Sequence, residues 1–425
     1  MRIIDGETGE LGRWIEDLER RRDNRDAVAG ATAQRIVEDV RIRGDEGVAD
    51  SVAELDGVRF APDELLVAPS SGMVSQELAA AVELAIARIT RFHEGQKPRS
   101  FVIDDGDTRL QQDVRPLRRV GIYVPGGAAT YISSLMMCAI PARLAGVGEI
   151  IVATTPSAAA SPALNYVCTV LGIREMYRAG GAAAIAAMAF GTGSLRRVDK
   201  IAGPGNAWVG AAKEFVRAWV GIDLVAGPSE IVVLADEAAD VELVVADLLA
   251  QAEHGADSVP IFVTTSRRIA REVSDRIEQQ LRTAPAAAAA MRSNAAIIVV
   301  RDLPAACALV DRLAPEHLEL MIRDPEAALE TIDNCAAIYV GASSGVALGD
   351  YAVGTNHVLP TGGSARYSSP LGVYDFVKRR SVVRLGEQTG ALVGAAAAIL
   401  ATAEGLPLHA RSCELRAVTA ERRAR

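Results

Sequence analysis

Glu316 and His317 are neighbouring residues with the two side-chain types most often used for proton transfer near neutral pH. They follow Pro315 within the stretch LAPEHLEL, residues 313–320. A carboxylate and an imidazole held at one point can serve as general acid and general base. This stretch is therefore the first candidate for a catalytic centre.

Three more short motifs contain side chains suited to the same site. They are QAEH ending at His254, GDY around Asp350 and EGLPLH ending at His409, and the chain has only five histidines. We interpret these motifs and LAPEHLEL as one site assembled from four distant segments. The alternative is that each pairing of a histidine with a carboxylate is a surface coincidence, which would have to be repeated in every segment.

The QAEH motif also has the spacing of a metal site. Gln251 and His254 are three residues apart on a predicted helix, so they share a face. An oxygen and an imidazole nitrogen can bind a divalent cation, and Asp350 and His409 are available to complete the set. Such ligands suit Zn²⁺, with Mn²⁺ or Co²⁺ also possible. The alternative is a helix end capped by His254.

Segments with strand character alternate with helices of about 10 to 15 residues, which predicts βαβ units and parallel sheets in an α/β fold. The alternation forms two sheet-based domains of similar plan, one from about 120 to 230 and the other from the material on either side. Predicted strand segments include 118–127, 146–156, 175–181, 259–264, 295–300 and 336–340, and predicted helices include 76–92, 241–254, 267–281 and 304–313.

Glycine-rich turns follow several of these strands and raise the question of a dinucleotide cofactor. The candidates are GIYVPGG at 121–127, the run from Gly180 and GPGN at 203–206. None has the spacing GxGxxG, and no GK[ST] follows any of them. They are either tight turns between strand and helix, or turns that place a helix N-terminus against a pyrophosphate.

Other polar residues in loops and at helix ends have two interpretations each. Ser229 follows a Gly-Pro turn, where its hydroxyl could contact a ligand or cap the turn. His357, in GTNHVLPT, is predicted to have a structural role. His93 is interpreted as ordinary polarity at a helix end.

The composition limits the class of protein. The chain has 425 residues, 50% of them hydrophobic, and a formal net charge of -9, which argues against nucleic-acid binding. Five scattered cysteines with no CxxC pair are typical of reduced cytosolic proteins. The N-terminus does not resemble a signal peptide, and the longest apolar run, Ala391 to Ala403, is about 13 residues, too short to span a bilayer. We therefore expect a cytoplasmic protein.

Taken together, the motifs resemble the histidinol dehydrogenase family over nearly the whole chain. The resemblance is carried by GIYVPGG, ISSLMMCAIPA, KIAGPGNAWV, AGPSE, AQAEHG, LAPEHLEL, LGDY, NHVLPTGG, SSPLGVYDFVKR and EGLPLHAR. It implies oxidation of L-histidinol to L-histidine through the aldehyde in two NAD⁺-dependent hydride transfers, by a zinc-containing homodimer that acts in histidine biosynthesis.

The resemblance also implies a domain plan with two incomplete Rossmann-like domains. Residues 1–20 would form an N-terminal arm. Residues 21–119 and 231–371 would form the first domain, with the zinc and acid/base residues, and 120–230 the second, with the NAD⁺ contacts. Residues 372–425 would form a mostly helical tail that reaches the partner subunit.

Matching the motifs residue by residue assigns the roles within the site. Glu316 and His317 match the acid/base pair, and Tyr123 and Asn206 match contacts to NAD⁺. The zinc ligands would be Gln251, His254, Asp350 and the partner subunit's His409. The substrate contacts would be Ser229, Gln251, His254, His317, Asp350, Glu404 and His409.

The chain departs from the family pattern near the cofactor. Ala183 stands where the family has a glutamine that contacts NAD⁺, and the loss of one hydrogen bond would weaken binding by about 0.5–1.5 kcal/mol. Ile132 replaces a usual proline, and EGLPLH replaces EGLDAH. These differences leave two alternatives: a paralogue that oxidises another small alcohol, such as a sulfonated diol, or a non-catalytic homologue that binds metal or ligand.

Overall fold

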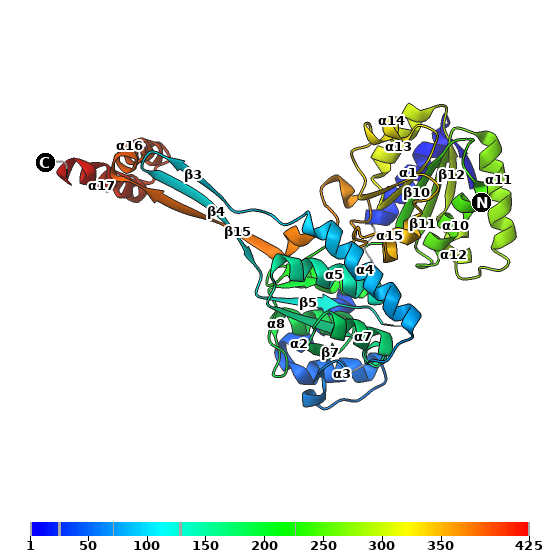
Figure 1. Cartoon of the computed structure of the whole chain (residues 1–425), viewed down its shortest axis with the longest axis horizontal. Coiled ribbons are helices and arrows are strands. Elements are labelled where there is room, and N and C mark those ends of the chain that lie inside the picture. The colour runs from blue at the N-terminus through cyan, green and yellow to red at the C-terminus, as the bar shows by residue number, and fades with distance from the viewer. Residues whose placement is uncertain (1, 24–26, 71, 127–129, 226, 424–425) are drawn as a thin grey trace. The chain divides into compact units, whose positions relative to one another are not determined.

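The computed structural model describes residues 2–23, 27–70, 72–126, 130–225 and 227–423, and these form an α/β protein with two six-stranded sheets and one three-stranded sheet (Figure 1). The predicted α/β class with parallel sheets is confirmed. Gly127 of GIYVPGG and Ala226 of AGPSE lie outside the described ranges.

The first sheet is entirely parallel and has the order β1-β12-β11-β10-β13-β14. Its strands are β1 (Arg2–Asp5), β10 (Glu230–Ala235), β11 (Val259–Thr264), β12 (Ala296–Val299), β13 (His317–Met321) and β14 (Ala337–Val340). The central strands are buried on both faces, which is why they read as almost continuous apolar runs such as EIVVLA and VPIFVT.

Helices cover both faces of this sheet. One core contains apolar residues of α10 (Val241–Ala252), α11 (Arg267–Gln280) and α12 (Ala288–Ser293). The core on the other face contains residues of α1 (Gly9–Asp23) and α13 (Leu303–Leu313). A helix that connects parallel strands runs back from the carboxyl edge of the sheet to its amino edge. The last turn of α10 therefore lies at the same edge as the first residues of β10 and β13.

The second sheet has the order β2-β7-β6-β5-β8-β9, with β2 antiparallel to β7 and the remaining pairs parallel. Its strands are β2 (Leu66–Val67), β5 (Arg119–Tyr123), β6 (Glu149–Thr154), β7 (Glu175–Arg178), β8 (Lys200–Ala202) and β9 (Gly221–Ile222). One core includes α2 (Ala27–Arg43), α3 (Asp45–Leu55), α8 (Gly181–Phe190) and α9 (Ala207–Val216). The other includes α4 (Gln76–Glu94), α5 (Ile132–Ala145) and α7 (Pro162–Val170).

The N-terminal part of the chain differs from the predicted domain plan. Residues 1–20 are not a separate arm, because β1 pairs with β12 and α1 buries Trp14 and Leu18 in the first domain. Residues 21–119 were assigned to the first domain, but α2, α3 and α4 pack on the second sheet. The apolar stripe of a helix predicts that it packs on something, but not which of two similar sheets it covers.

A separate unit consists of residues 97–116 and 377–425. It contains an antiparallel sheet of β3 (Phe101–Asp105), β4 (Thr108–Pro116) and β15 (Val377–Leu385), followed by α16 (Glu387–Ala403) and α17 (Pro407–Arg423). The predicted tail 372–425 was mostly helical, and the strands were missed. The two-residue Gly-Asp turn between β3 and β4, where Gly106 has φ 58°, was the available signal.

The remaining elements are short, and no described helix combines the length and apolarity of a membrane span. They are α6 (Pro156–Ala159), α14 (Pro325–Leu329), α15 (Val346–Tyr351) and single 3₁₀ turns at Pro62–Glu64, Ser364–Arg366 and Val373–Phe376.

A buried ion pair fixes the turn between β8 and α9. The Lys213 and Asp223 side chains are 3% and 0% exposed and lie 2.6 Å apart. Lys213 also donates to the carbonyl of Gly203, whose N–H donates to Asp223 at 2.7 Å. Gly203 has φ +120°, and a Cβ there would lie 2.1 Å from the carbonyl oxygen of Tyr123. The ion pair thus binds both the main-chain N–H and the carbonyl of Gly203, a position that only glycine can occupy.

Replacing Lys213 with methionine tests this arrangement. Lys213→Met leaves the Asp223 carboxylate buried without its cation, so we expect the free energy of unfolding to fall by about 3–5 kcal/mol. Urea denaturation followed by circular dichroism measures the change. Arg268→Met, which removes an exposed partner of Glu272 on α11, is the matched control and should change stability little. Equal small losses in both variants would contradict the prediction.

Candidate active site at the amino edge of the first sheet

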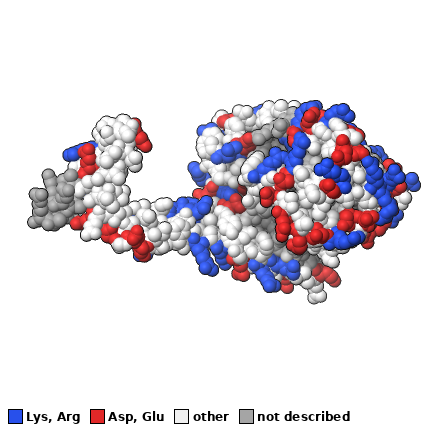
Figure 2. Space-filling model, turned by 90° about the horizontal axis from the view of Figure 1, so that it is seen from above, with Lys and Arg blue, Asp and Glu red and all other residues white. Residues whose placement is uncertain are grey.

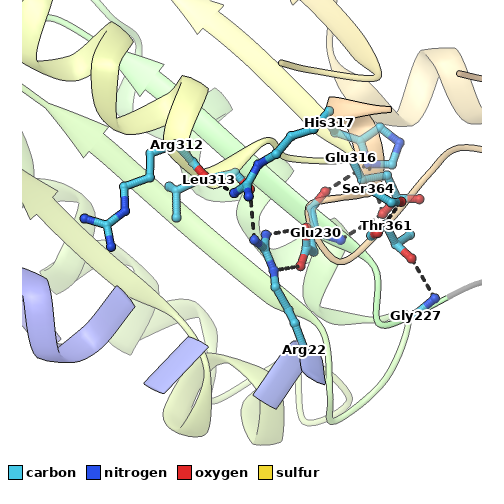
Figure 3. Close-up of polar contacts among 10 residues, drawn as sticks. Arg22, Gly227, Glu230, Arg312, Leu313, Glu316, His317, Thr361 and Ser364 are labelled. Carbon is cyan, nitrogen blue, oxygen red and sulfur yellow. Dashed lines mark hydrogen bonds and ion pairs between the residues drawn. The ribbon is translucent and has the colours of Figure 1, made fainter. Parts of the chain in front are cut away.

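Glu316 and His317 lie where β13 begins, beside the first residues of β10, and both side chains are buried. The main-chain N–H of Glu230 donates to Glu316 Oε2 at 2.8 Å. His317 Nδ1 lies 3.0 Å from the carbonyl oxygen of Glu230. A carbonyl oxygen only accepts, so Nδ1 carries the proton and Nε2 keeps its lone pair. The predicted pair is thus held by the two main-chain polar groups of one residue, Glu230 (Figure 3).

Burial sets the protonation of this pair. It lowers the pKa of His317 to about 4, so the imidazole is neutral at pH 7. It raises the pKa of Glu316 well above the usual range; the Glu230 N–H opposes this shift, and the charges of Glu230 and Asp350 add to it. A neutral imidazole has a free lone pair that can accept a proton, and the raised pKa of Glu316 brings its proton exchange closer to neutral pH.

Asp350 and two more histidines lie close to the pair. His317 Nε2 is 3.8 Å from Asp350 Oδ1, and the charges of His254 and His357 contribute to the low pKa of His317. His357 Nδ1 lies 2.6 Å from the carbonyl oxygen of Asp350, and its Nε2 lies 3.1 Å from Ser134 Oγ. With both ring nitrogens engaged, His357 has contacts that fit its predicted structural role. Burial raises the pKa of Asp350 to about 7.

Gln251 and His254 are one turn apart, with Gln251 in the last turn of α10 and His254 just beyond the end of the helix. The helix α10 ends at Ala252, and His254 belongs to the following turn, where its N–H donates to the carbonyl of Gln251 at 3.3 Å. The Gln251 side chain is buried, and its amide nitrogen has no hydrogen-bond partner in the described structure. An unpartnered buried amide calls for a ligand or a water.

The donors at this edge fit a zinc ion, although one chain does not complete the set. The Gln251 side-chain oxygen, a His254 ring nitrogen and the Asp350 carboxylate are donor types that suit Zn²⁺, and a cation beside Asp350 would offset the burial that raises its pKa. No cluster of three or more His, Cys, Asp or Glu side chains that could bind a metal occurs within the described ranges.

The other predicted substrate and metal residues lie in two places. Ser229 precedes β10 at the same edge, and its carbonyl accepts from Val259 N–H at 2.9 Å. Glu404 and His409 belong to the separate unit. Glu404 caps the end of α16, His409 lies near the start of α17, and both side chains are exposed.

The predicted cofactor residues lie at the carboxyl edge of the second sheet, where ligands of α/β sheets commonly bind. Tyr123 ends β5, and its hydroxyl accepts from Gly181 N–H at 3.1 Å at the start of α8. Asn206 caps α9 by accepting from Val209 N–H at 3.1 Å, and its side chain is exposed. Ala183 is buried in the first turn of α8.

Comparison with known proteins identifies the family. The family model described as histidinol dehydrogenase matches residues 18–417. The chain belongs to the histidinol dehydrogenase family. It is 45% identical to histidinol dehydrogenase of Rhodospirillum rubrum over 396 residues, 90% of each chain, and 41% identical to that of Syntrophotalea carbinolica over 426 residues, 98% of this chain and 99% of the relative.

A solved histidinol dehydrogenase structure, from Elizabethkingia anophelis, matches the fold over almost the whole chain. The TM-score is 0.90 at 33% identity, covering 99% of this chain and 98% of that one. The predicted family is therefore confirmed, and with it the arrangement of two sheet-based domains.

Sequence reasoning missed two residues of this histidinol dehydrogenase family member and misjudged a third. Glu230 lies within the GPSE motif but was not singled out, and Arg22, its ion-pair partner, is 208 positions away. His93 lies at the end of α4 as predicted, but it is not ordinary polarity there. It is fully buried, with Nδ1 2.8 Å from Ile89 O and Nε2 3.3 Å from the Asn356 amide nitrogen. Only its position after an apolar helix face hinted at burial.

Proposed function

We propose that this chain oxidises L-histidinol to L-histidine through histidinal, with reduction of two NAD⁺, as the last step of histidine biosynthesis. The observation that carries the proposal is the buried Glu316–His317 pair, with the His317 tautomer set by a main-chain carbonyl, in a chain of the histidinol dehydrogenase family. The pair lies beside Asp350, where an alcohol held at the edge of the sheet would meet a basic nitrogen.

His317 has the geometry of the base for the first oxidation. Its Nε2 is buried, keeps a lone pair and has no hydrogen-bond partner in the described residues. It would take the hydroxyl proton as the carbinol carbon loses its hydride, and NAD⁺ bound near Tyr123 and Asn206 would accept that hydride. Acid/base help of this type is worth about 10²- to 10⁴-fold.

Glu316 would act mainly in the second oxidation. The aldehyde must first gain water, and the Glu316 carboxylate would remove a proton from that water. Each hydride transfer releases a proton, and formation of the carboxylate releases another, so both side chains must pass protons onward. The raised pKa of Glu316 brings its proton exchange closer to neutral pH.

We further propose that Gln251, His254 and Asp350 hold a Zn²⁺ with the partner subunit's His409. Zinc bound there would act as a template that fixes the imidazole and amine of the substrate. The remaining substrate contacts would come from Ser229 and Glu404. Support comes from the nitrogen and oxygen donor types of these side chains and from the buried Asp350 carboxyl group beside His317.

A homodimer with exchanged tails would supply the missing donor. The separate unit exposes large apolar side chains on its sheet and helices: Phe101, Ile103, Leu392, Ile399, Leu400 and Leu408. Figure 2 shows white surface over much of it between smaller groups of red and blue atoms, whereas Lys and Arg are interspersed with Asp and Glu over the larger part. An exposed apolar surface of this kind is typical of a protein–protein interface. A second copy of the chain would cover it and present His409.

We also propose a cytoplasmic location for this enzyme. All five cysteines are free, and Cys138, Cys168 and Cys307 are buried thiols, as expected in a reducing compartment. The mixed surface charges of Figure 2 and the acidic balance do not favour nucleic-acid binding.

The activity itself is the first prediction. Purified protein with Zn²⁺ and NAD⁺ should form two NADH for each L-histidinol consumed, followed by absorbance at the NADH band and by product analysis. His317→Asn is the control and should lose the first oxidation. Turnover of a sulfonated diol or another alcohol in place of histidinol would favour a paralogue. Absence of both turnover and NAD⁺ binding would indicate a non-catalytic homologue.

The second prediction concerns the separate roles of Glu316 and His317 in the two oxidations. Glu316→Gln keeps an oxygen that can accept from Glu230 N–H but cannot remove a proton from water. We expect the oxidation of histidinal to fall about 10²- to 10⁴-fold, and more than that of histidinol. Separate rates with the alcohol and the aldehyde as substrates measure the difference. Equal loss in both half-reactions would contradict the assignment.

The exchanged tail gives the third prediction. His409→Asn should lower the zinc content of the purified protein, measured by metal analysis. Mixing His409→Asn with Gln251→Ala under conditions that exchange subunits should restore about a quarter of wild-type activity, because half the dimers then contain one complete site. A ligand donated within the same chain would give no recovery on mixing, and unchanged zinc in His409→Asn would remove it from the ligand set.

A further inference from the structure

We propose that the buried ion pair of Arg22 and Glu230 positions the acid/base pair, by fixing the main-chain N–H and carbonyl of Glu230, which orient Glu316 and select the tautomer of His317. The inference rests on the proposed dehydrogenase activity and assigns positioning roles to two residues outside the matched catalytic, metal and substrate set. Neither side chain contacts the reacting atoms, and both act through Glu316 and His317.

The ion pair itself is closely defined. Arg22 reaches in from α1 and is 9% exposed, and Glu230 is 1% exposed. The guanidinium Nε and Nη2 donate to the two carboxylate oxygens of Glu230, both at 2.8 Å (Figure 3). Two parallel bonds between planar groups fix orientation as well as distance, which a lysine could not do.

The same guanidinium also holds the segment that leads to the acid/base pair. Its Nη1 donates to the carbonyl of Leu313 at 2.9 Å. The next residue, Ala314, has φ 47° and is the one non-glycine residue with positive φ in the described ranges. A left-handed alanine costs about 1–2 kcal/mol and persists only where neighbouring contacts enforce it. Arg22 therefore restrains the turn two residues before Glu316.

The ion pair with Arg22 restrains the main-chain groups of Glu230 that contact Glu316 and His317. The N–H of Glu230 donates to Glu316 Oε2 at 2.8 Å, and its carbonyl accepts from His317 Nδ1 at 3.0 Å. Glu230 is the first residue of β10, where the ladder to β13 begins only at Ile231 and His317. On its other side Glu230 pairs with Val259 of β11, so the ion pair with Arg22 is the contact that restrains the residue on the side facing β13. A shift of the Glu230 main chain away from β13 would release both Glu316 and His317.

The competing explanation is that the ion pair only stabilises the fold. The stability and turnover of a double variant distinguish this from a positioning role. Buried ion pairs add little net stability, and replacing both partners by apolar residues of similar size is often neutral. Two methionines fill the same volume, but they do not restrain the main chain of residue 230 through a bidentate ion pair. The double variant Arg22→Met/Glu230→Met should therefore fold and bind zinc, yet turn over slowly.

The experiment compares four variants of the full-length holoenzyme: Arg22→Met, Arg22→Lys, the double methionine variant and Arg119→Met. Arg119 is a matched control, because it is equally buried and bonded to Glu149 and Glu175, but lies on the second sheet away from the acid/base pair. We expect kcat to fall about 10- to 100-fold in Arg22→Met and in the double variant, with zinc content and the KM for NAD⁺ unchanged. Arg22→Lys should retain an intermediate kcat. Arg119→Met should lose stability but keep kcat within about twofold.

A spectroscopic measurement separates this inference from the activity. With ring-¹⁵N-labelled histidine, five imidazoles give signals, and His317 is assigned by its absence in His317→Asn. The wild type should show a protonated Nδ1 and an unprotonated Nε2, whereas Arg22→Met should show a mixture of tautomers. This readout stands even if the wild type does not oxidise histidinol. An unchanged His317 tautomer, or a fall in kcat no larger than in Arg119→Met, would overturn the proposal.

Discussion

The parallel pairing of β10 with β13 is the constraint on which the site depends. It sets Ile231 beside His317, so the residues just before them, Glu230 and Glu316, start their strands side by side. Parallel strands need a crossover helix, and α10 returns Gln251 and the following His254 to that same edge. One register therefore gathers an acid/base pair and two candidate metal ligands from segments more than sixty positions apart.

The two sheets use opposite edges for their candidate sites. Ligands of open α/β sheets usually bind at the carboxyl ends of the strands, and Tyr123 and Asn206 occupy that edge of the second sheet. The first sheet carries Glu316, His317 and Gln251 at its amino edge instead. At its carboxyl edge, the Asp236 carboxylate accepts from the main-chain N–H of Arg323 and bridges the ends of β10 and β13.

Several buried polar side chains lie on the α10 face of the first sheet. The Gln251 amide, His317 Nε2, the Glu319 carboxylate and the Tyr339 hydroxyl are all buried without a hydrogen-bond partner among the described residues. Unsatisfied groups are rare in folded proteins and here gather beside one site. Burial, with the charge of Asp247 added, also raises the pKa of Glu319 to about 9. A substrate and a cation bound at the edge would interact with the outermost of these groups, and these new interactions would contribute to the free energy of binding.

The sequence by itself determined the α/β class, the family, and the strands β10, β11, β12 and β14 of the first sheet, because the period of apolar residues and the turn chemistry are local properties. It did not predict β1 or β13 as strands. It also pointed to Glu316 and His317 as a candidate acid/base pair, since the two residues are adjacent in the chain. It did not determine which sheet α2, α3 and α4 cover, the burial of His93 or the ion pair between Arg22 and Glu230. Those features depend on contacts between distant segments, and the free energy of such contacts is decided only when both partners are packed and water is excluded. The tautomer of His317 belongs to the same group, because it is set by a carbonyl that only the pairing of β10 with β13 brings within reach.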